Sequence, residues 1–142
     1  MYLLDTNIVS ANAPAKRKVG PEAFASWVRE HSERLYLSTV AIAKIGIARA
    51  DRLGAATKAE RLRRWLAALE HFYAERIQPF GIEEARQAGA ILDRARAHNP
   101  GFEDIAIAAT AAVRGFTILT ANERHFRPLG VAFVNPLKQL PR

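Results

Sequence analysis

The stretch that decides the fold is DIAIAATAAVRGFTILT, residues Asp104–Thr120. Its first part, as far as Arg114, is rich in alanine and isoleucine and predicts a helix. Gly115 stands where such a helix would end, because glycine readily adopts the left-handed conformation that closes helices. The apolar run Phe116–Thr120 then predicts a strand that stops at a polar residue. A helix followed directly by a buried strand is typical of folds in which strands and helices alternate.

The rest of the chain repeats this alternation of short apolar runs and longer stretches with helical spacing. Strands are expected at 2–4, 35–37, 77–80 (weakened by Pro79), 116–120 and 131–134. Helices are expected from Pro21, after a cap at Ser38 or Thr39, from Thr57, over 83–98 and over 104–114, with an exposed loop at 12–20. We therefore predict a single α/β domain spanning 1–142, whose mainly parallel sheet is covered by helices on both faces.

Composition narrows the class of protein. Of the 142 residues, 49% are hydrophobic and 25% are charged, which is the balance of an ordinary globular domain. No apolar run approaches the roughly 18–20 residues of a membrane span, and the first residues do not have the pattern of a secretion signal. Cysteine is absent, so disulfides and thiolate metal sites are excluded. We expect a cytoplasmic protein without membrane association.

The formal net charge of +7 favours a polyanionic partner. The basic residues form four separate groups: Lys16–Lys18, Arg61 with Arg63 and Arg64, Arg94 with Arg96, and Arg124 with Arg127. This distribution suits phosphate contacts over a wide surface. A GC-rich genome also encodes arginine freely, so the charge alone does not separate an RNA enzyme from a DNA-binding module.

Polar residues follow the predicted strands. Asp5 ends the first strand, Asp104 begins the alanine-rich helix, and Asn122 and Glu123 follow the strand that ends at Thr120. Ligands of open α/β sheets bind beyond the carboxyl ends of the strands, and converging oxygen ligands suit Mg²⁺ or Mn²⁺. Taken singly, however, Asp5 can cap a helix, Asp104 can offset a helix dipole and Glu123 can be a solvated charge.

Four segments together resemble one known family. They are Leu3–Asn7, Leu35–Ile42, Asp104–Thr110 (the pattern D-x-x-I-A-A-T), and Thr120–Asn122 with Phe126. Each is similar to a motif of the PIN-domain ribonucleases of the VapC toxin family, in its FitB-like branch. The motifs at Leu3–Asn7 and Asp104–Thr110 are specific together, and the similarity extends from Met1 to Pro136.

The resemblance implies a three-layer α/β/α PIN domain and a metal-dependent endoribonuclease. Such a toxin hydrolyses RNA, often transfer RNA, when it is released from its cognate VapB-type antitoxin. The implied assembly is a homodimer that reaches operator DNA only through the antitoxin. A water activated by Mg²⁺ or Mn²⁺ would attack the phosphate and leave a 5′-phosphate and a 3′-hydroxyl.

The resemblance also assigns roles to individual residues. Asp5 and Asp104 are implied to be catalytic residues that bind the metal. Asn122, where many relatives carry Asp, takes a further catalytic position. The neighbouring Glu123 could compensate for the missing charge, although its side chain is expected to point elsewhere. His98 and His125 lie near the motifs and are expected to be exposed loop residues.

One position departs from the family pattern. After Ser38–Ala43, relatives place Glu, whereas this chain has Lys44. Like charges at ~4 Å repel by about 1 kcal/mol in water and about 4 kcal/mol at an effective dielectric of 20. We expect an inactivating substitution, with the Lys44 ammonium inside the acidic pocket close to Asp5 or Asp104. The alternative is that Lys44 points away and supports RNA binding.

The sequence leaves two alternative functions open, and it also predicts a binding surface for the antitoxin. The chain could be a catalytically inert PIN domain that dimerises and holds an antitoxin in an operator-DNA complex. A flavodoxin-like response domain shares the fold class, but its acidic pair and phosphorylatable Asp are not found. An apolar groove for the antitoxin is expected from Trp27 and the helical stripe Trp65–Phe72; both could instead be core or dimer seam.

Overall fold

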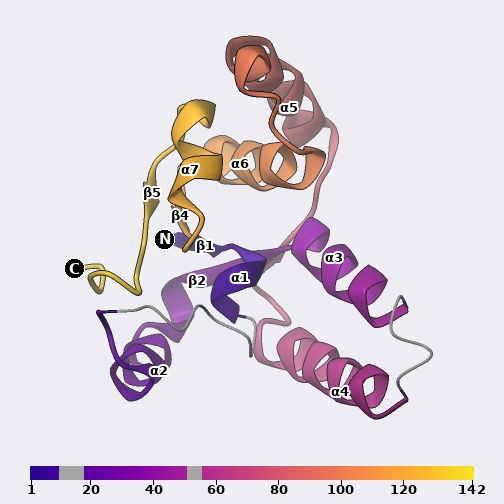
Figure 1. Ribbon diagram of the computed structural model, residues 1–142, viewed down its shortest axis with the longest axis vertical. Coiled ribbons are helices and arrows are strands. Elements are labelled where there is room, and N and C mark those ends of the chain that lie inside the picture. Colours follow the sequence, from indigo (N-terminus) through magenta and orange to yellow (C-terminus); the bar gives the residue numbers. More distant parts are fainter. Residues whose placement is uncertain (10–17, 51–55) are drawn as a thin grey trace.

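The computed structural model describes residues 1–9, 18–50 and 56–142. Within these residues a five-stranded sheet has the order β3-β2-β1-β4-β5, and every pairing is parallel (Figure 1). The strands are β1 (Tyr2–Leu4), β2 (Leu35–Ser38), β3 (Ile77–Gln78), β4 (Thr117–Leu119) and β5 (Phe133–Val134). The predicted parallel α/β fold is confirmed.

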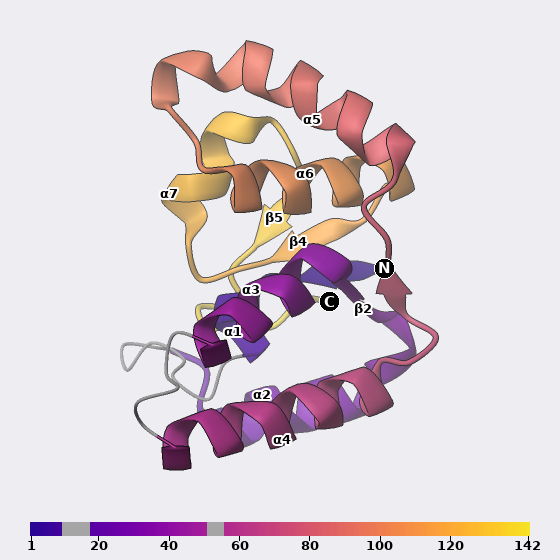
Figure 2. The same cartoon turned by 90° about the vertical axis from the view of Figure 1, so that its right-hand side faces the viewer.

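Helices cover both faces of this sheet. They are α1 (Thr6–Val9), α2 (Pro21–Glu30), α3 (Thr39–Ala50), α4 (Ala56–Phe72), α5 (Ile82–Ala95), α6 (Phe102–Arg114) and α7 (Glu123–Phe126). Helices α5, α6 and α7 lie on one side of the sheet, and α2 and α4 lie on the other (Figures 1 and 2). The result is the expected three-layer α/β/α arrangement.

Two apolar clusters hold the layers together. Successive side chains of a strand point to opposite faces, so neighbouring residues enter different clusters. Leu3 and Ile118 pack with α5 and α6, whereas Leu4 and Leu119 pack with residues of α2, α3 and α4. The central strands β1 and β4 are therefore buried on both faces, as expected for a parallel sheet.

Local signals set several helix ends. The Ser38 hydroxyl accepts a hydrogen bond from the Ala41 amide at 3.0 Å, which confirms one of the two caps expected for α3. Gly115 has φ of 68° and follows α6 directly, so a side chain there would strain the turn. At the start of α5, the Glu84 carboxylate accepts a hydrogen bond from the Gly81 amide and caps the first turn of that helix.

Some boundaries differ from those expected. The strand predicted at 77–80 contains only Ile77–Gln78, because Pro79 cannot donate to a ladder. Helix α6 begins at Phe102, two residues early, so Asp104 lies inside the first turn. The short helices α1 and α7 were not expected. Lys16 and Arg17 of the first basic group lie outside the described residues.

No helix in the described part of the chain is both long and apolar enough to cross a bilayer.

Candidate active site

Asp5 is the buried centre of the candidate site. It follows β1 directly, and its amide donates to the carbonyl of Leu119 on β4 at 3.0 Å. Its carboxylate accepts one hydrogen bond from the Thr6 amide and another from the Thr120 hydroxyl, each at 2.8 Å. Only 3% of the residue is exposed. The carboxylate is therefore held rigidly at the carboxyl edge of the sheet, where it was predicted to lie.

The surroundings of Asp5 disfavour its charged form. Burial raises the pKa of Asp5 above its usual value, and the negative charge of Asp104 raises it further. Hydrogen bonds from Thr120 and Thr6 and the positive charge of Lys44 lower this pKa, but they do not outweigh the increase. The effect of Asp104 on Asp5 shows that these two carboxylates, far apart in sequence, lie close enough to interact.

Asp104 approaches this edge from the first turn of α6. It is half-buried, and its Oδ2 lies 3.0 Å from Nδ1 of His125 on α7. His125 is exposed, as expected, but it lies in helix α7 instead of a loop, and its contact with Asp104 was not predicted from the sequence. It is one residue that sequence reasoning missed. The only available signal was its position three residues after Asn122, which places both in the same turn.

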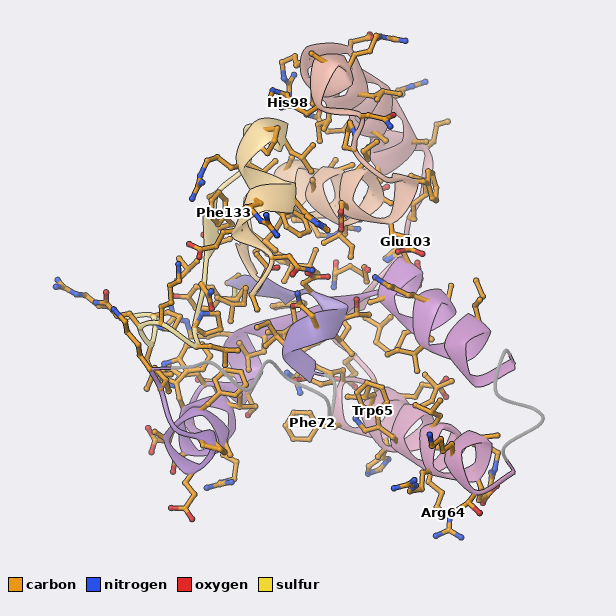
Figure 3. The ribbon with its side chains drawn as sticks, viewed as in Figure 1. Arg64, Trp65, Phe72, His98, Glu103 and Phe133 are labelled. Atoms are coloured by element: carbon orange, nitrogen blue, oxygen red, sulfur yellow. The ribbon has the colours of Figure 1, made fainter. Side chains whose placement is uncertain are left out.

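Lys44 projects from α3 toward the N-terminal turn of α6. Its ammonium forms an ion pair with Glu103 at 3.1 Å, and Glu103 points into the space between α6 and α3 (Figure 3). The prediction that the Lys44 ammonium lies against Asp5 or Asp104 is therefore wrong. The physical reason is solvation: the Lys44 and Glu103 side chains are 44% and 50% exposed, so the ammonium stays hydrated instead of being buried beside Asp5.

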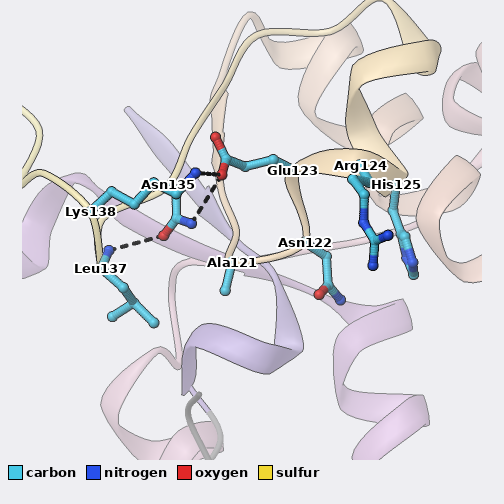
Figure 4. Close-up of a pocket in the computed structure, with 8 residues that line it drawn as sticks. All are labelled: Ala121, Asn122, Glu123, Arg124, His125, Asn135, Leu137 and Lys138. Carbon is cyan, nitrogen blue, oxygen red and sulfur yellow. Dashed lines mark hydrogen bonds and ion pairs between the residues drawn. The ribbon is translucent and has the colours of Figure 1, made fainter. Parts of the chain in front are cut away.

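The residues that follow β4 lie at one side of the carboxylate pair. Asn122 is exposed, and its amide donates to the Thr120 hydroxyl oxygen at 2.9 Å. Glu123 pairs with Lys138 and accepts a hydrogen bond from Asn135 (Figure 4). The hydrogen bond from Lys138 is the main cause that lowers the pKa of Glu123. Glu123 is thus engaged away from Asp5, as expected for the direction of its side chain.

Asn7, on α1, has a buried side-chain amide near this edge of the sheet. Its Oδ1 accepts a hydrogen bond from the Ala121 amide at 3.3 Å, whereas its buried Nδ2 has no partner among the described residues. Buried polar atoms normally have a partner, so this donor marks a place where an acceptor such as water fits.

The described residues do not fit a complete magnesium site. No group of three or more His, Asp or Glu side chains among them is placed to hold one ion. The charge of Asp104 acts on Asp5, but Asn122 adds no charge, and the ammonium of Lys44 is close enough to lower the pKa of Asp5. Sites for Mg²⁺ rely on well-placed oxygen ligands, and a neighbouring cation opposes a divalent ion.

The groove expected for an antitoxin is only partly supported. Trp27 is 6% exposed, stacks on His31 at 4.8 Å, and donates from Nε1 to the Pro141 carbonyl at 3.2 Å. The prediction that Trp27 lines a groove is wrong, because the chain's own C-terminal segment covers this side chain. On α4, Trp65 is half-buried and Phe72 is exposed, so this helix still offers apolar surface (Figure 3).

The fold and the carboxylates at its edge define a class of protein. The chain belongs to the PIN domain family, whose profile matches residues 2–130. Among its members it is VapC-like. It is 31% identical to the plasmid stability protein StbB of Pseudomonas syringae pv. tomato, an alignment that covers 96% of this chain and 98% of the relative. It is 27% identical to the VapC ribonuclease Y4jK of Sinorhizobium fredii, over 96% and 97% of the two chains.

Solved structures agree with this assignment. A chain of FitAcB from Neisseria gonorrhoeae superimposes with a TM-score of 0.78 at 29% identity, covering 96% of this chain and 98% of the other. A chain of VapBC2 from Rickettsia felis, bound to a DNA fragment from its promoter, gives a TM-score of 0.75 at 18% identity. It covers 94% and 97% of the two chains, and this second likeness supports the fold alone.

Proposed function

We propose that this chain is the toxin component of a toxin–antitoxin pair, with the architecture of a metal-dependent endoribonuclease whose chemistry Lys44 has disabled. The natural substrate of that architecture is RNA, with transfer RNA as the first candidate. The observation that carries the proposal is that Asp5 and Asp104 interact at the carboxyl edge, with the charge of Lys44 also acting on Asp5. A relative named as a VapC ribonuclease supports the substrate class.

The argument for a disabled site is electrostatic. Asp5, Asp104 and Asn122 are proposed as the site residues, and they supply two charges at most. Replacing a carboxylate by the Lys44 ammonium changes the local charge by two units. A divalent ion is repelled twice as strongly as a monovalent one, and a ligand is lost as well. Binding of Mg²⁺ or Mn²⁺ is therefore expected to be weak, while the fold, which does not depend on the ion, is retained.

The proposed partners are a VapB-type antitoxin and a second copy of this chain. Structures similar to this one include FitAB bound to an IR36 DNA fragment and VapBC2 bound to promoter DNA, so operator DNA would be reached through the antitoxin. Ile47, Ile82 and Phe102 are all more than 60% exposed, on α3, α5 and α6. We propose that the antitoxin or the second copy covers these apolar side chains.

The second candidate is an inert PIN domain kept to dimerise and hold an antitoxin at operator DNA. The ion pair between Lys44 and Glu103 favours it, because both side chains are satisfied without a metal. The two candidates differ in one property. A disabled ribonuclease regains cleavage when the carboxylate is restored, whereas a domain that has lost the rest of its machinery does not.

The experiment is a cleavage assay on total transfer RNA with Mn²⁺, comparing the wild type with Lys44→Glu. We expect Lys44→Glu to cleave at least about 100-fold faster, because losing even an outer partner of a metal site costs about 10- to 100-fold. Lys44→Gln is the matched control, since it removes the cation without adding a ligand, and it should stay near the wild type. Robust cleavage by the wild type, or none by Lys44→Glu, would contradict the proposal.

A further inference from the structure

A hollow lies beside the residues that contact the carboxylate pair. It has a volume of about 390 Å³ and is bordered by Asn122, Arg124 and His125 on one side and by Asn135 and Lys138 on the other (Figure 4). This volume is within the range of sites that bind small organic molecules, about 300–1,000 Å³. Its walls are mostly polar, so the occupant that it fits is hydrophilic.

The charges around this hollow are unequal. Lys138 pairs with Glu123, which also accepts from Asn135, so that wall is electrically neutral. His125 contacts Asp104. Arg124 is exposed, and among the described ion pairs none involves it. Its guanidinium lies beside His125 and near Asn122 (Figure 4). An unpaired guanidinium presents a planar fork of donors that matches a phosphate.

Two residues that border the hollow are connected to the carboxylate pair by hydrogen bonds. The amide of Asn122 donates to the Thr120 hydroxyl oxygen, and that hydroxyl donates to Asp5. The imidazole of His125 lies 3.0 Å from Asp104. His125 therefore contacts one carboxylate directly, and the main chain of Asn122 is connected to the other through Thr120. A strand with one phosphate at Asp5 and Asp104 would place a neighbouring nucleotide in the hollow.

We propose that this hollow binds one nucleotide of a single-stranded RNA, with Arg124 on its phosphate and the exposed side-chain amide of Asn122 on its sugar or base. Amide side chains hydrogen-bond base edges and the 2′-hydroxyl, which is the group that distinguishes RNA from DNA. The choice of RNA rests on the proposed function. The binding itself requires neither a metal nor cleavage, so a disabled ribonuclease would still hold RNA here.

The test measures binding of a fluorescent single-stranded RNA octamer by anisotropy, in EDTA, at several salt concentrations. Arg124→Gln should weaken binding about 5- to 10-fold and reduce the magnitude of the salt slope by about 0.7, the contribution of one phosphate contact on a single strand. Arg86→Gln removes another exposed arginine, from the first half of α5, and should change the affinity by less than about twofold. Asn122→Ala should weaken the RNA octamer more than a DNA octamer of the same sequence.

Equal losses for Arg124→Gln and Arg86→Gln would overturn the subsite, because they would show only the effect of net charge. Absence of RNA binding by the wild type would overturn it too. An acidic peptide that binds this surface more tightly than RNA, with the same dependence on Arg124, would assign the hollow to a protein partner and also overturn it. None of these results depends on cleavage, so the subsite can fail while Lys44→Glu regains activity, and the reverse also holds.

Discussion

Asp5 is held where a negative charge is unfavourable. Burial and the charge of Asp104 both raise its pKa, and the hydrogen bonds from Thr120 and Thr6 reduce this effect without cancelling it. The folded protein thus favours the protonated form of Asp5 more than the unfolded chain does. The stability that this proton provides is complete below the unfolded pKa and is lost as the pH rises through the higher folded pKa. Above that pH range the buried carboxyl of Asp5 therefore lowers stability.

The first prediction concerns the pH dependence of Asp5→Asn. This variant keeps an acceptor for the Thr6 amide and removes the buried charge, so its Tm should exceed that of the wild type at pH 7.5. In a protein of this size about 2–4 °C corresponds to 1 kcal/mol, so such a gain is measurable by circular dichroism. The gain should shrink at pH 4. Asp93→Asn, an exposed control on α5, should show neither effect. A variant that is destabilised equally at both pH values would contradict the burial argument.

For single residues, the sequence predicts where they lie in the fold better than it predicts which side chains they contact. Asp5 and Asp104 could be placed at one edge, because strand ends and helix starts meet there in a parallel sheet. The partner of Lys44 could not be predicted, because a long side chain can reach several acidic groups, and solvation decides among them. The same limit hid the contact of His125 with Asp104, which depends on the short helix α7.

At the scale of elements, one buried ion pair connects α5, α6 and β3. Arg114 at the end of α6 lies 2.6 Å from Glu84 on α5 and also donates to Gln78 on β3. The Glu84 side chain is 6% exposed and accepts from the Gly81 amide as well. The hydrogen bond from the main chain is the first cause that lowers its pKa, and that from Arg114 adds to it. This network fixes how α5 sits on α6.

The second prediction is that Arg114→Met destabilises the protein by about 3 kcal/mol, because it leaves the Glu84 carboxylate buried without its cation. The double variant Arg114→Met, Glu84→Gln should recover much of this loss, since the amide can still accept from Gly81. Urea unfolding measures both. Arg86→Met breaks an exposed pair with Glu83 and should cost less than about 1 kcal/mol. A loss for Arg114→Met no larger than for Arg86→Met would show that the network does not hold the two helices.

Element boundaries followed from the sequence where a local signal was strong. Ser38 and Gly115 mark ends that side-chain and backbone chemistry fix locally. The assignment of Trp27 to a groove failed, because an apolar stripe on a helix does not reveal what covers it. Here the covering group is the C-terminal segment, whose Pro141 carbonyl accepts from the indole. Long-range packing of this kind is absent from any local pattern.

At the scale of the whole molecule, the alternation of strands and helices predicted a parallel three-layer fold. It did not predict the strand order β3-β2-β1-β4-β5, because right-handed crossovers allow several orders. The order matters for the site. It places β1 beside β4, so Asp5 and Thr120 are neighbours and the hollow at Asn122 opens next to the carboxylates.

The central claim is that Lys44 has removed metal binding from a fold that otherwise keeps its PIN architecture. The third prediction concerns Lys44→Glu. This change adds a negative charge near three others, those of Glu103, Asp5 and Asp104, and the negative charges repel one another. Without metal, this variant should have a lower Tm than the wild type, and Mn²⁺ should raise it again. The wild type should show no such response, because it has no site for the ion to stabilise.

The most direct measurement is calorimetric titration of Mn²⁺ into the wild type, Lys44→Gln and Lys44→Glu under identical buffer conditions. We predict saturable binding near one ion per chain for Lys44→Glu, and none in the same concentration range for the other two proteins. Saturable binding by the wild type that is lost in Asp5→Asn would contradict the claim, since it would show that Asp5 and Asp104 hold the ion despite Lys44.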